Sequence, residues 1–149
     1  HQLCCDRRLH GGMAGQYDLA IKDLDKAIAV SPNYPNAYGS RGLIHVARNE
    51  HAAAVKDFSK AIDLHPFHTM YYARATAYYS MQRYDLAVKD MDAAIAQVPT
   101  FAGYYLGRSQ NYYGLRQYAK AIADARMCLQ LGGQIPPQYI MMLNAVANE

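Results

Sequence analysis

The chain of 149 residues has no tryptophan, three cysteines and few charged side chains, which make up 18% of the total. Its 15 Lys and Arg residues are scattered among 12 Asp and Glu residues, and no three basic residues follow one another. Binding a phosphate backbone requires clustered cations, so the sequence argues against nucleic-acid binding. No apolar stretch reaches the roughly 20 residues that a membrane-spanning helix needs. We therefore expect neither a nucleic-acid partner nor insertion into a membrane.

The cysteines argue against a disulfide framework. Their number is odd, and two of them, Cys4 and Cys5, are neighbours whose mutual disulfide would be strained. This usage favours a reducing compartment such as the cytoplasm, and the localisation is otherwise open. The first residue is His1, and the first ten residues resemble neither a signal peptide nor a transit peptide, so we expect a processing or expression boundary there.

What the sequence has in excess is tyrosine, with 14 residues against three phenylalanines. Hydrophobic residues make up 52% of the chain. A compact chain of this size buries roughly 68–70% of the surface that its unfolded form exposes, which suffices for a core without metal or disulfide. Because charges are few, many tyrosines must both pack and face solvent.

Several residue types recur along the chain at one common spacing. Ala20, Ala54, Ala87 and Ala121 are separated by 34, 33 and 34 residues. Four more columns keep this spacing: Arg7, Arg41, Arg74 and Arg108; Asp23, Asp57, Asp90 and Asp124; Ala27, Ala61, Ala94 and Cys128; and Pro32, Pro66 and Pro99. Such self-similarity indicates stacked structural units. We expect units near residues 1–34, 35–67, 68–101 and 102–135, followed by one helix within 136–149.

Each unit has the pattern of two helices joined by a turn. In the second helix of the first unit, apolar residues such as Tyr17, Ile21 and Leu24 follow helical spacing, and Pro32 ends the helix. The first helices of the later units carry a small residue where two helices must approach closely: Gly42, Ala75 and Ser109.

Taken together, these residues resemble the tetratricopeptide repeat (TPR). The motif is a tyrosine and a small residue in the first helix, followed in the second by aromatic or apolar residues, alanines and a proline. The second unit has Tyr38, Gly42, His51, Ala54, Phe58, Ala61 and Pro66, and the third has Tyr71, Ala75, Tyr84, Ala87, Met91, Ala94 and Pro99. The resemblance covers essentially the whole chain. It implies an all-α fold, an α-solenoid or superhelix of antiparallel helix pairs with about four repeats and one extra C-terminal helix, in a single array over residues 1–149.

Both ends of the array depart from the motif. The first unit has Cys4 and Arg8 where a tyrosine and a small residue belong, and its Gly11 and Gly12 each cost a helix roughly 1 kcal/mol against Ala. We expect its first helix to be frayed or only partly formed. The last helix, near residues 138–148, is apolar and has no charge before Glu149. Either the array continues in a longer protein, or this helix meets a partner, such as a second copy of the chain.

The recurring charges are expected to be structural rather than catalytic, because a column present in every unit serves what every unit does, namely joining helices. We expect ion pairs among Arg41, Arg74, Arg108, Asp23, Asp57, Asp90 and Asp124. The sequence has no phosphate loop, no paired-carboxylate motif and no activated nucleophile. We therefore expect no enzymatic activity, catalytic residues, metal site or cofactor.

The resemblance also implies where a ligand would bind, because the first helices of a TPR array line its concave side. The residues expected in this groove are Leu43, Tyr72, Thr76, Tyr79, Leu106, Gln110 and Tyr113. None is charged. Chaperone adaptors of this family grip a terminal carboxylate at places that here hold Cys5, Leu9, Ser40, Thr69 and Ala73, so a carboxylate-clamp partner is not expected.

The hypothesis is therefore a scaffold or adaptor that binds a peptide or helix of a partner protein through apolar or aromatic anchors. Three alternatives stay open. The tyrosines could merely solvate a helix face, the array could be a regulatory or helper domain of a larger protein, or it could self-assemble through residues 138–148.

Overall fold

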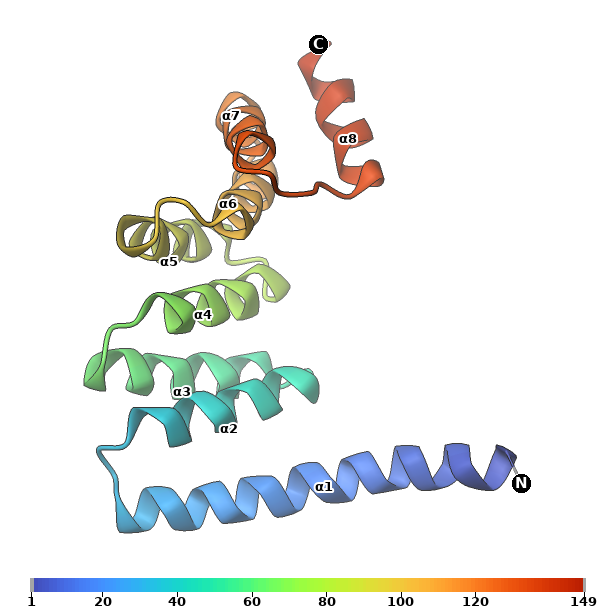
Figure 1. Cartoon of the computed structure of the whole chain (residues 1–149), viewed down its shortest axis with the longest axis vertical. Coiled ribbons are helices and arrows are strands. Elements are labelled where there is room, and N and C mark those ends of the chain that lie inside the picture. The colour runs from blue at the N-terminus through green and yellow to red at the C-terminus, as the bar shows by residue number, and fades with distance from the viewer. Residues whose placement is uncertain (1, 149) are drawn as a thin grey trace. The chain divides into compact units, whose positions relative to one another are not determined.

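The computed structural model describes the backbone of residues 2–148 and the side chains of residues 15–148. Within this part of the chain there are eight helices and no strand (Figure 1). They are α1 (Gln2–Val30), α2 (Pro35–Ala47), α3 (His51–Leu64), α4 (His68–Ser80), α5 (Tyr84–Gln97), α6 (Ala102–Gly114), α7 (Tyr118–Gln130) and α8 (Pro137–Ala147). The chain divides into two compact units after His65, so α1–α3 form the first and α4–α8 the second. None of the described helices is long and apolar enough to cross a membrane.

Helices α2 and α3, α4 and α5, and α6 and α7 form three pairs, each closed by the same turn. One residue of each turn has a positive φ near 60°: Asn49, Gln82 and Arg116. The next residue donates its backbone N–H back across the helix end, over 2.7 Å to His45 O in the first pair. The other pairs repeat this bond at 2.8 and 2.9 Å. This is the hydrogen bond of a Schellman C-cap, which offsets the strain of the left-handed residue.

Small residues let the paired helices cross closely, as predicted. A Cβ added to Gly42 would lie 2.6 Å from the ring of Phe58, which is fully buried. In the next pair Ala75 belongs to the same buried cluster as Met91. Alanines of the repeat columns have no exposed surface in these pairs: Ala54, Ala61, Ala75, Ala87, Ala94 and Ala121. In the first two pairs the core is therefore a seam of small residues filled by one larger side chain, Phe58 or Met91.

The first repeat, residues 1–34, differs from the expectation. Instead of a helix pair with a frayed first helix, α1 is one continuous helix that runs through Gly11, Gly12 and Gly15 (Figure 1). Gly15 stands where Asn49 makes its turn, yet it is helical. A continuous helix keeps its backbone hydrogen bonds, whereas folding back would set Arg8 at the crossing that requires a small residue.

Because the first repeat has a single helix, one face of α1 is not covered by a second helix of the same repeat. Ala27 is exposed, although Ala61 and Ala94 in the same column are fully buried. Asp23 is likewise exposed, whereas Asp57 keeps only 4% of its surface accessible. The residues of the column are present, but the helix that would cover them is not folded against them.

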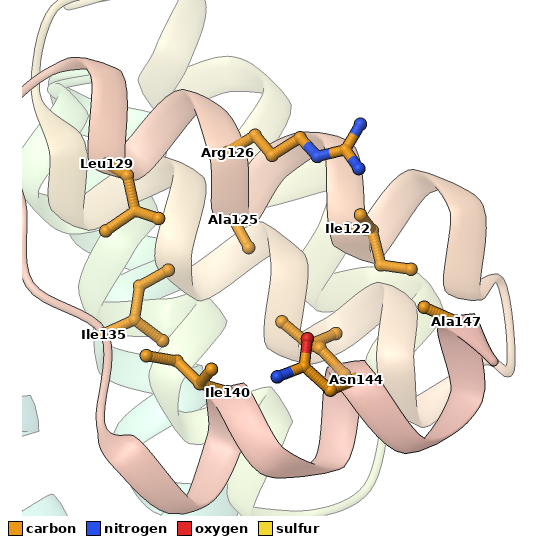
Figure 2. Close-up of a pocket in the computed structure, with 9 residues that line it drawn as sticks. Ile122, Ala125, Arg126, Leu129, Ile135, Ile140, Asn144 and Ala147 are labelled. Carbon is orange, nitrogen blue, oxygen red and sulfur yellow. The ribbon is translucent and has the colours of Figure 1, made fainter.

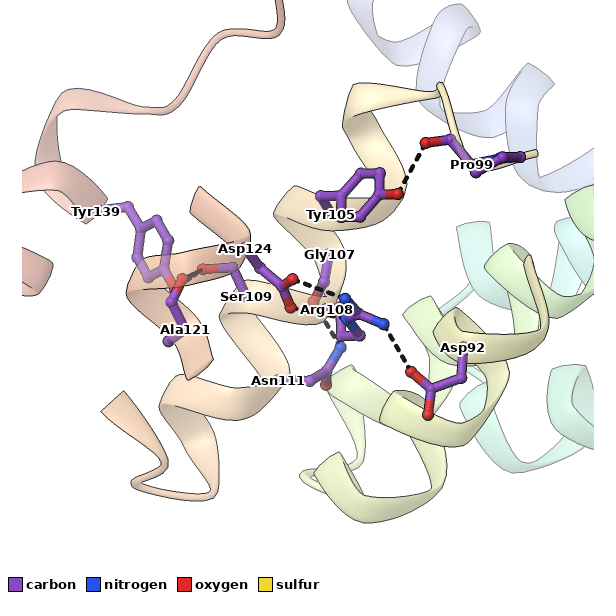
Figure 3. Close-up of polar contacts among 10 residues, drawn as sticks. All are labelled: Asp92, Pro99, Tyr105, Gly107, Arg108, Ser109, Asn111, Ala121, Asp124 and Tyr139. Carbon is purple, nitrogen blue, oxygen red and sulfur yellow. Dashed lines mark hydrogen bonds and ion pairs between the residues drawn. The ribbon is translucent and has the colours of Figure 1, made fainter. Parts of the chain in front are cut away.

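Helix α8 follows α7 after Gly132, whose φ is +84°, and begins at a pair of prolines. It packs through Tyr139 and Leu143 onto a cluster that includes residues of α6 and α7. Tyr139 also exchanges a 2.7 Å hydrogen bond with the Ser109 hydroxyl, which donates a 2.6 Å bond to the Ala121 carbonyl oxygen (Figure 3). This chain of hydroxyls ties α8 to the preceding helix pair.

Candidate functional site

The charged columns form ion pairs that join helices. Arg74 binds Asp90 through its Nε and Nη2 atoms at 2.8 and 2.7 Å. Arg41 and Asp57, and Arg108 and Asp124, repeat this arrangement 16 residues apart. The three aspartates are buried, and hydrogen bonding to them raises the pKa of each arginine above its ordinary value. Each guanidinium is thus held charged, and its hydrogen bonds are used within the repeat, which suits a structural role.

Arg41 and Arg108 also bind an aspartate of the preceding repeat. Arg108 donates from Nη1 to Asp92 at 3.0 Å, so that it bridges α5 and α7 (Figure 3). Arg41 makes the matching bond to Asp25 of α1 at 2.8 Å. Asp23 was expected to form such an ion pair, but it has no ion-pair partner among the side chains that the structure describes. Its column partner, Arg7, lies in the same helix 16 residues away, or about 24 Å along the axis.

Four of the predicted groove residues come together in the compact unit formed by α4–α8. Tyr72, Thr76, Tyr79 and Gln110 line a pocket of about 210 Å³, and its remaining walls are Ala75, Met91, Gly107 and Asn111. The pocket therefore opens between α4 and α6, with Met91 of α5 also in its wall. No charged side chain lines it. Tyr72 and Tyr79 are 39% and 43% exposed, so both are available for contact.

A second pocket, of about 350 Å³, adjoins the first because Tyr79 and Gln110 line both. It brings in the predicted Tyr113, together with Tyr84, Gly114, Arg116, Tyr118 and Met142. The four tyrosines form two contacting pairs, with ring centroids 5.7 Å apart for Tyr79 and Tyr84, and 5.2 Å for Tyr113 and Tyr118. We call these two pockets together the tyrosine groove.

Two predicted groove residues are not part of the tyrosine groove. Leu106 is half-buried and packs against the buried cluster that includes Tyr105 and Tyr139. Leu43 lies on α2, in the compact unit formed by α1–α3, and 54% of its surface is exposed.

Among the pocket residues that sequence reasoning did not assign to the groove are Arg116 and Asn111. Arg116 supplies a charge from the turn after α6, outside the helix where groove residues were sought. Asn111 lines the first pocket although it is 1% exposed. The repeat itself held a signal for Asn111, because the same column has Ile44 and Ala77 in the two preceding units.

A third pocket lies between α7 and α8 (Figure 2). Its volume is about 180 Å³, and it is lined mainly by apolar side chains: Ile122, Ala125, Leu129, Ile135, Ile140, Leu143 and Ala147, with Arg126 and Asn144. On α8, Met141 is 70% exposed, and Met142, which lines the second pocket, is 43% exposed.

The described side chains offer no other chemical centre. Among them, no three His, Cys, Asp or Glu residues come close enough to hold a metal ion. Cys128 is buried in the small-residue column, and burial raises the pKa of its thiol. A raised pKa keeps a thiol protonated and unreactive.

Comparison with known proteins decides the family. One model described as TPR repeat matches residues 14–47, and two described as tetratricopeptide repeat match residues 35–68 and 72–134. The chain belongs to the tetratricopeptide-repeat family. TPR domains are protein–protein interaction modules, and their repeat scaffold is typically non-catalytic. The all-α helix pairs predicted from the sequence are confirmed.

Solved TPR structures share the fold at low identity. The MamA RS-1 ArsTM double mutant aligns with a TM-score of 0.76 at 22% identity, over 87% of this chain and 72% of its own. MamA from Desulfovibrio magneticus RS-1, from residue 41 to its end, gives 0.75 at 23%, with the same coverage. The first TPR of Spaghetti (RPAP3), bound to the HSP90 peptide SRMEEVD, gives 0.73 at 17%, over 77% of this chain and 94% of its own. A search of curated proteins finds no match.

Proposed function

We propose that this TPR domain is a non-enzymatic scaffold that binds an extended peptide or a helix of a partner protein in the tyrosine groove. The observation that carries the proposal is the pair of adjoining pockets, which share Tyr79 and Gln110. A tyrosine offers a large apolar face with a polar tip, so it can bury a partner's side chain and still donate a hydrogen bond. Pocket walls of this kind favour apolar or aromatic anchors.

The charges around the groove bear on the class of partner. The first pocket has no charged wall, and the second has one, Arg116. One of the similar structures is a TPR bound to an HSP90 peptide, but this chain has Ser40, Thr69 and Ala73 at clamp positions. A partner that is held by its terminal carboxylate is therefore not the one we propose.

The test begins with a library of displayed peptides, selected on the immobilised protein. The double variant Tyr72→Ala plus Tyr113→Ala should lose at least tenfold in affinity for the selected peptides, because each change removes an aromatic wall. Tyr34→Ala is the matched control, since Tyr34 is 50% exposed and lies outside both pockets. Circular dichroism and thermal melting verify that the variants stay folded. Unchanged affinity in a folded double variant would refute groove binding.

A second candidate function is self-association through α8. It is favoured by the apolar pocket between α7 and α8 (Figure 2) and by the exposed Met141, which follows Ile140 of that pocket in the chain. Light scattering should then give the mass of a dimer or larger assembly, and Met141→Lys should return it to the monomer. A monodisperse monomer at high concentration would exclude this candidate. The third hypothesis, a helper domain of a larger protein, is decided by the full-length gene.

A further inference from the structure

Asn111 breaks the pattern of its own repeat column. The equivalent positions hold Ile44 and Ala77, and Ala77 is fully buried. Asn111 is equally inaccessible, with 1% of its surface exposed. Asparagine is a weaker helix former than alanine, and a buried amide must find hydrogen bonds that an apolar side chain does not need. Neither helix formation nor packing accounts for an amide here.

The orientation of this amide follows from its one hydrogen bond. Asn111 Nδ2 donates to the carbonyl oxygen of Gly107 at 2.8 Å (Figure 3). Since a carbonyl can only accept, the nitrogen must face Gly107 and the oxygen must face away from it. That oxygen, Oδ1, is buried and has no hydrogen-bond partner among the residues that the structure describes. A buried acceptor without a partner is unfavourable, so a donor that reached it would be bound with a gain.

The walls of the first pocket do not supply that donor. The hydroxyl of Thr76 is engaged, because it donates to the Tyr72 carbonyl oxygen at 3.0 Å. Met91 also lines the pocket, and its Cε would be 2.4 Å from a Cβ added to Gly107. A methionine side chain is flexible and adapts its rotamer readily, so it can yield to a group that enters the pocket it shares with Asn111.

We propose that Asn111 Oδ1 accepts a hydrogen bond from a backbone N–H of an extended peptide whose apolar side chain enters the first pocket. This inference rests on the proposed groove function, and it identifies Asn111 as the residue that binds the main chain of the peptide. A neutral N–H fits better than an ammonium group, because the pocket has no acidic wall to compensate a desolvated cation. The volume of about 210 Å³ exceeds the roughly 150 Å³ of an engineered cavity that holds benzene, so an aromatic or branched side chain can enter.

Proline is excluded at the residue that supplies the N–H, because its nitrogen carries no hydrogen. The same reasoning provides a chemical probe. Methylation of one backbone nitrogen removes a single donor from a peptide and leaves its side chains in place.

The experiment uses a peptide selected by display whose binding is lost in Tyr72→Ala plus Tyr113→Ala. A series of this peptide, methylated at one backbone nitrogen at a time, is titrated into the wild type and into Asn111→Leu by calorimetry. We expect one methylation to weaken binding to the wild type at least tenfold and to Asn111→Leu less than twofold. Asn111→Ala repeats the comparison in case leucine disturbs the packing, and Asn36→Leu, at an exposed site on α2, is the control.

The outcomes separate this inference from the proposed function. If the peptides need the tyrosines but no methylation is coupled to Asn111, main-chain reading by Asn111 is wrong and groove binding stands. If no selected peptide depends on the tyrosines, the proposed function fails and this inference fails with it.

Discussion

Arg108 holds the carboxylate of Asp124 by two parallel hydrogen bonds of 2.8 Å, Nε to Oδ2 and Nη2 to Oδ1, between the two helices of one repeat. The side chain of Asp124 is 9% exposed and that of Arg108 is 21% exposed. The same guanidinium lies over the rings of Tyr105 and Tyr112, at 5.6 and 5.8 Å from their centroids. One arginine thus fixes a carboxylate and two column tyrosines, which explains why these residues recur together.

Arg108→Ala should therefore be strongly destabilising, because it leaves the buried carboxylate of Asp124 without its partner. Breaking a buried ion pair in this way costs about 3–5 kcal/mol. Asp23→Ala is the matched comparison, since Asp23 occupies the same column but is exposed, and its effect should stay within about 0.5 kcal/mol. Urea denaturation followed by circular dichroism measures both. Equal losses for the two variants would contradict the assignment of Asp23 to an uncovered face.

Gly15→Ala tests the continuity of α1. Glycine in a helix interior is less favourable than alanine by about 0.5–1 kcal/mol, and a Cβ at Gly15 meets no atom within 4 Å. We expect the variant to be more stable by about that amount and slightly more helical. If Gly15 instead made the left-handed turn that Asn49 makes, alanine there would be strained and the variant would lose stability.

The crossing of Gly42 and Phe58 predicts a compensating pair of changes. A Cβ at residue 42 would lie 2.6 Å from the buried ring, and overpacking of this kind costs about 1–3 kcal/mol. Gly42→Ala should lose that much stability. Adding Phe58→Met reproduces the pair that the next repeat uses, Ala75 with Met91, and should recover most of the loss. A double variant that is less stable than Gly42→Ala alone would show that this crossing does not govern the pair.

Tyr139 predicts a dependence on alkaline pH. Burial raises the pKa of its hydroxyl from 10.0 to about 12, so the folded protein holds this proton more firmly than the unfolded chain does. The associated stability is complete below about pH 10 and is lost as the pH rises toward 12. Denaturation curves across this range should fall more steeply for the wild type than for Tyr139→Phe, which cannot ionise there. Parallel curves would mean that Tyr139 has no such shift.

The sequence predicted the features that every repeat must share. Helix pairing requires a small residue at the crossing and a charged pair between the helices, so columns such as Ala75 and Arg74 carried the information in their spacing. Prediction was weaker where one unit differs from the others. Whether α1 is continuous or folds back depends on the free energy of packing its N-terminal half against the rest of the helix, compared with leaving that half in solvent. The spacing of residues in the sequence carries no information on this balance.

Helix register alone was enough to predict that some of the pocket residues lie together. It places Tyr72 and Tyr79 on one face of their helix, and Gln110 on the corresponding face of the next first helix. Leu106, which was also predicted for the groove, is half-buried and packs against the cluster that includes Tyr139, a contact that only the folded chain reveals. Asn111 could have been noticed as a polar residue in an apolar column, but its partnerless oxygen is visible only once its hydrogen bond to Gly107 is known.

The central claim, a peptide-binding groove between α4 and α6, is tested most directly by nuclear magnetic resonance of the isotope-labelled protein titrated with a display-selected peptide. The account predicts that the largest shift changes arise at Tyr72, Tyr79, Gln110 and Asn111, and that they saturate together with one dissociation constant. Changes confined to Ile140, Met141 and Asn144 on α8, with the groove signals unmoved, would contradict it.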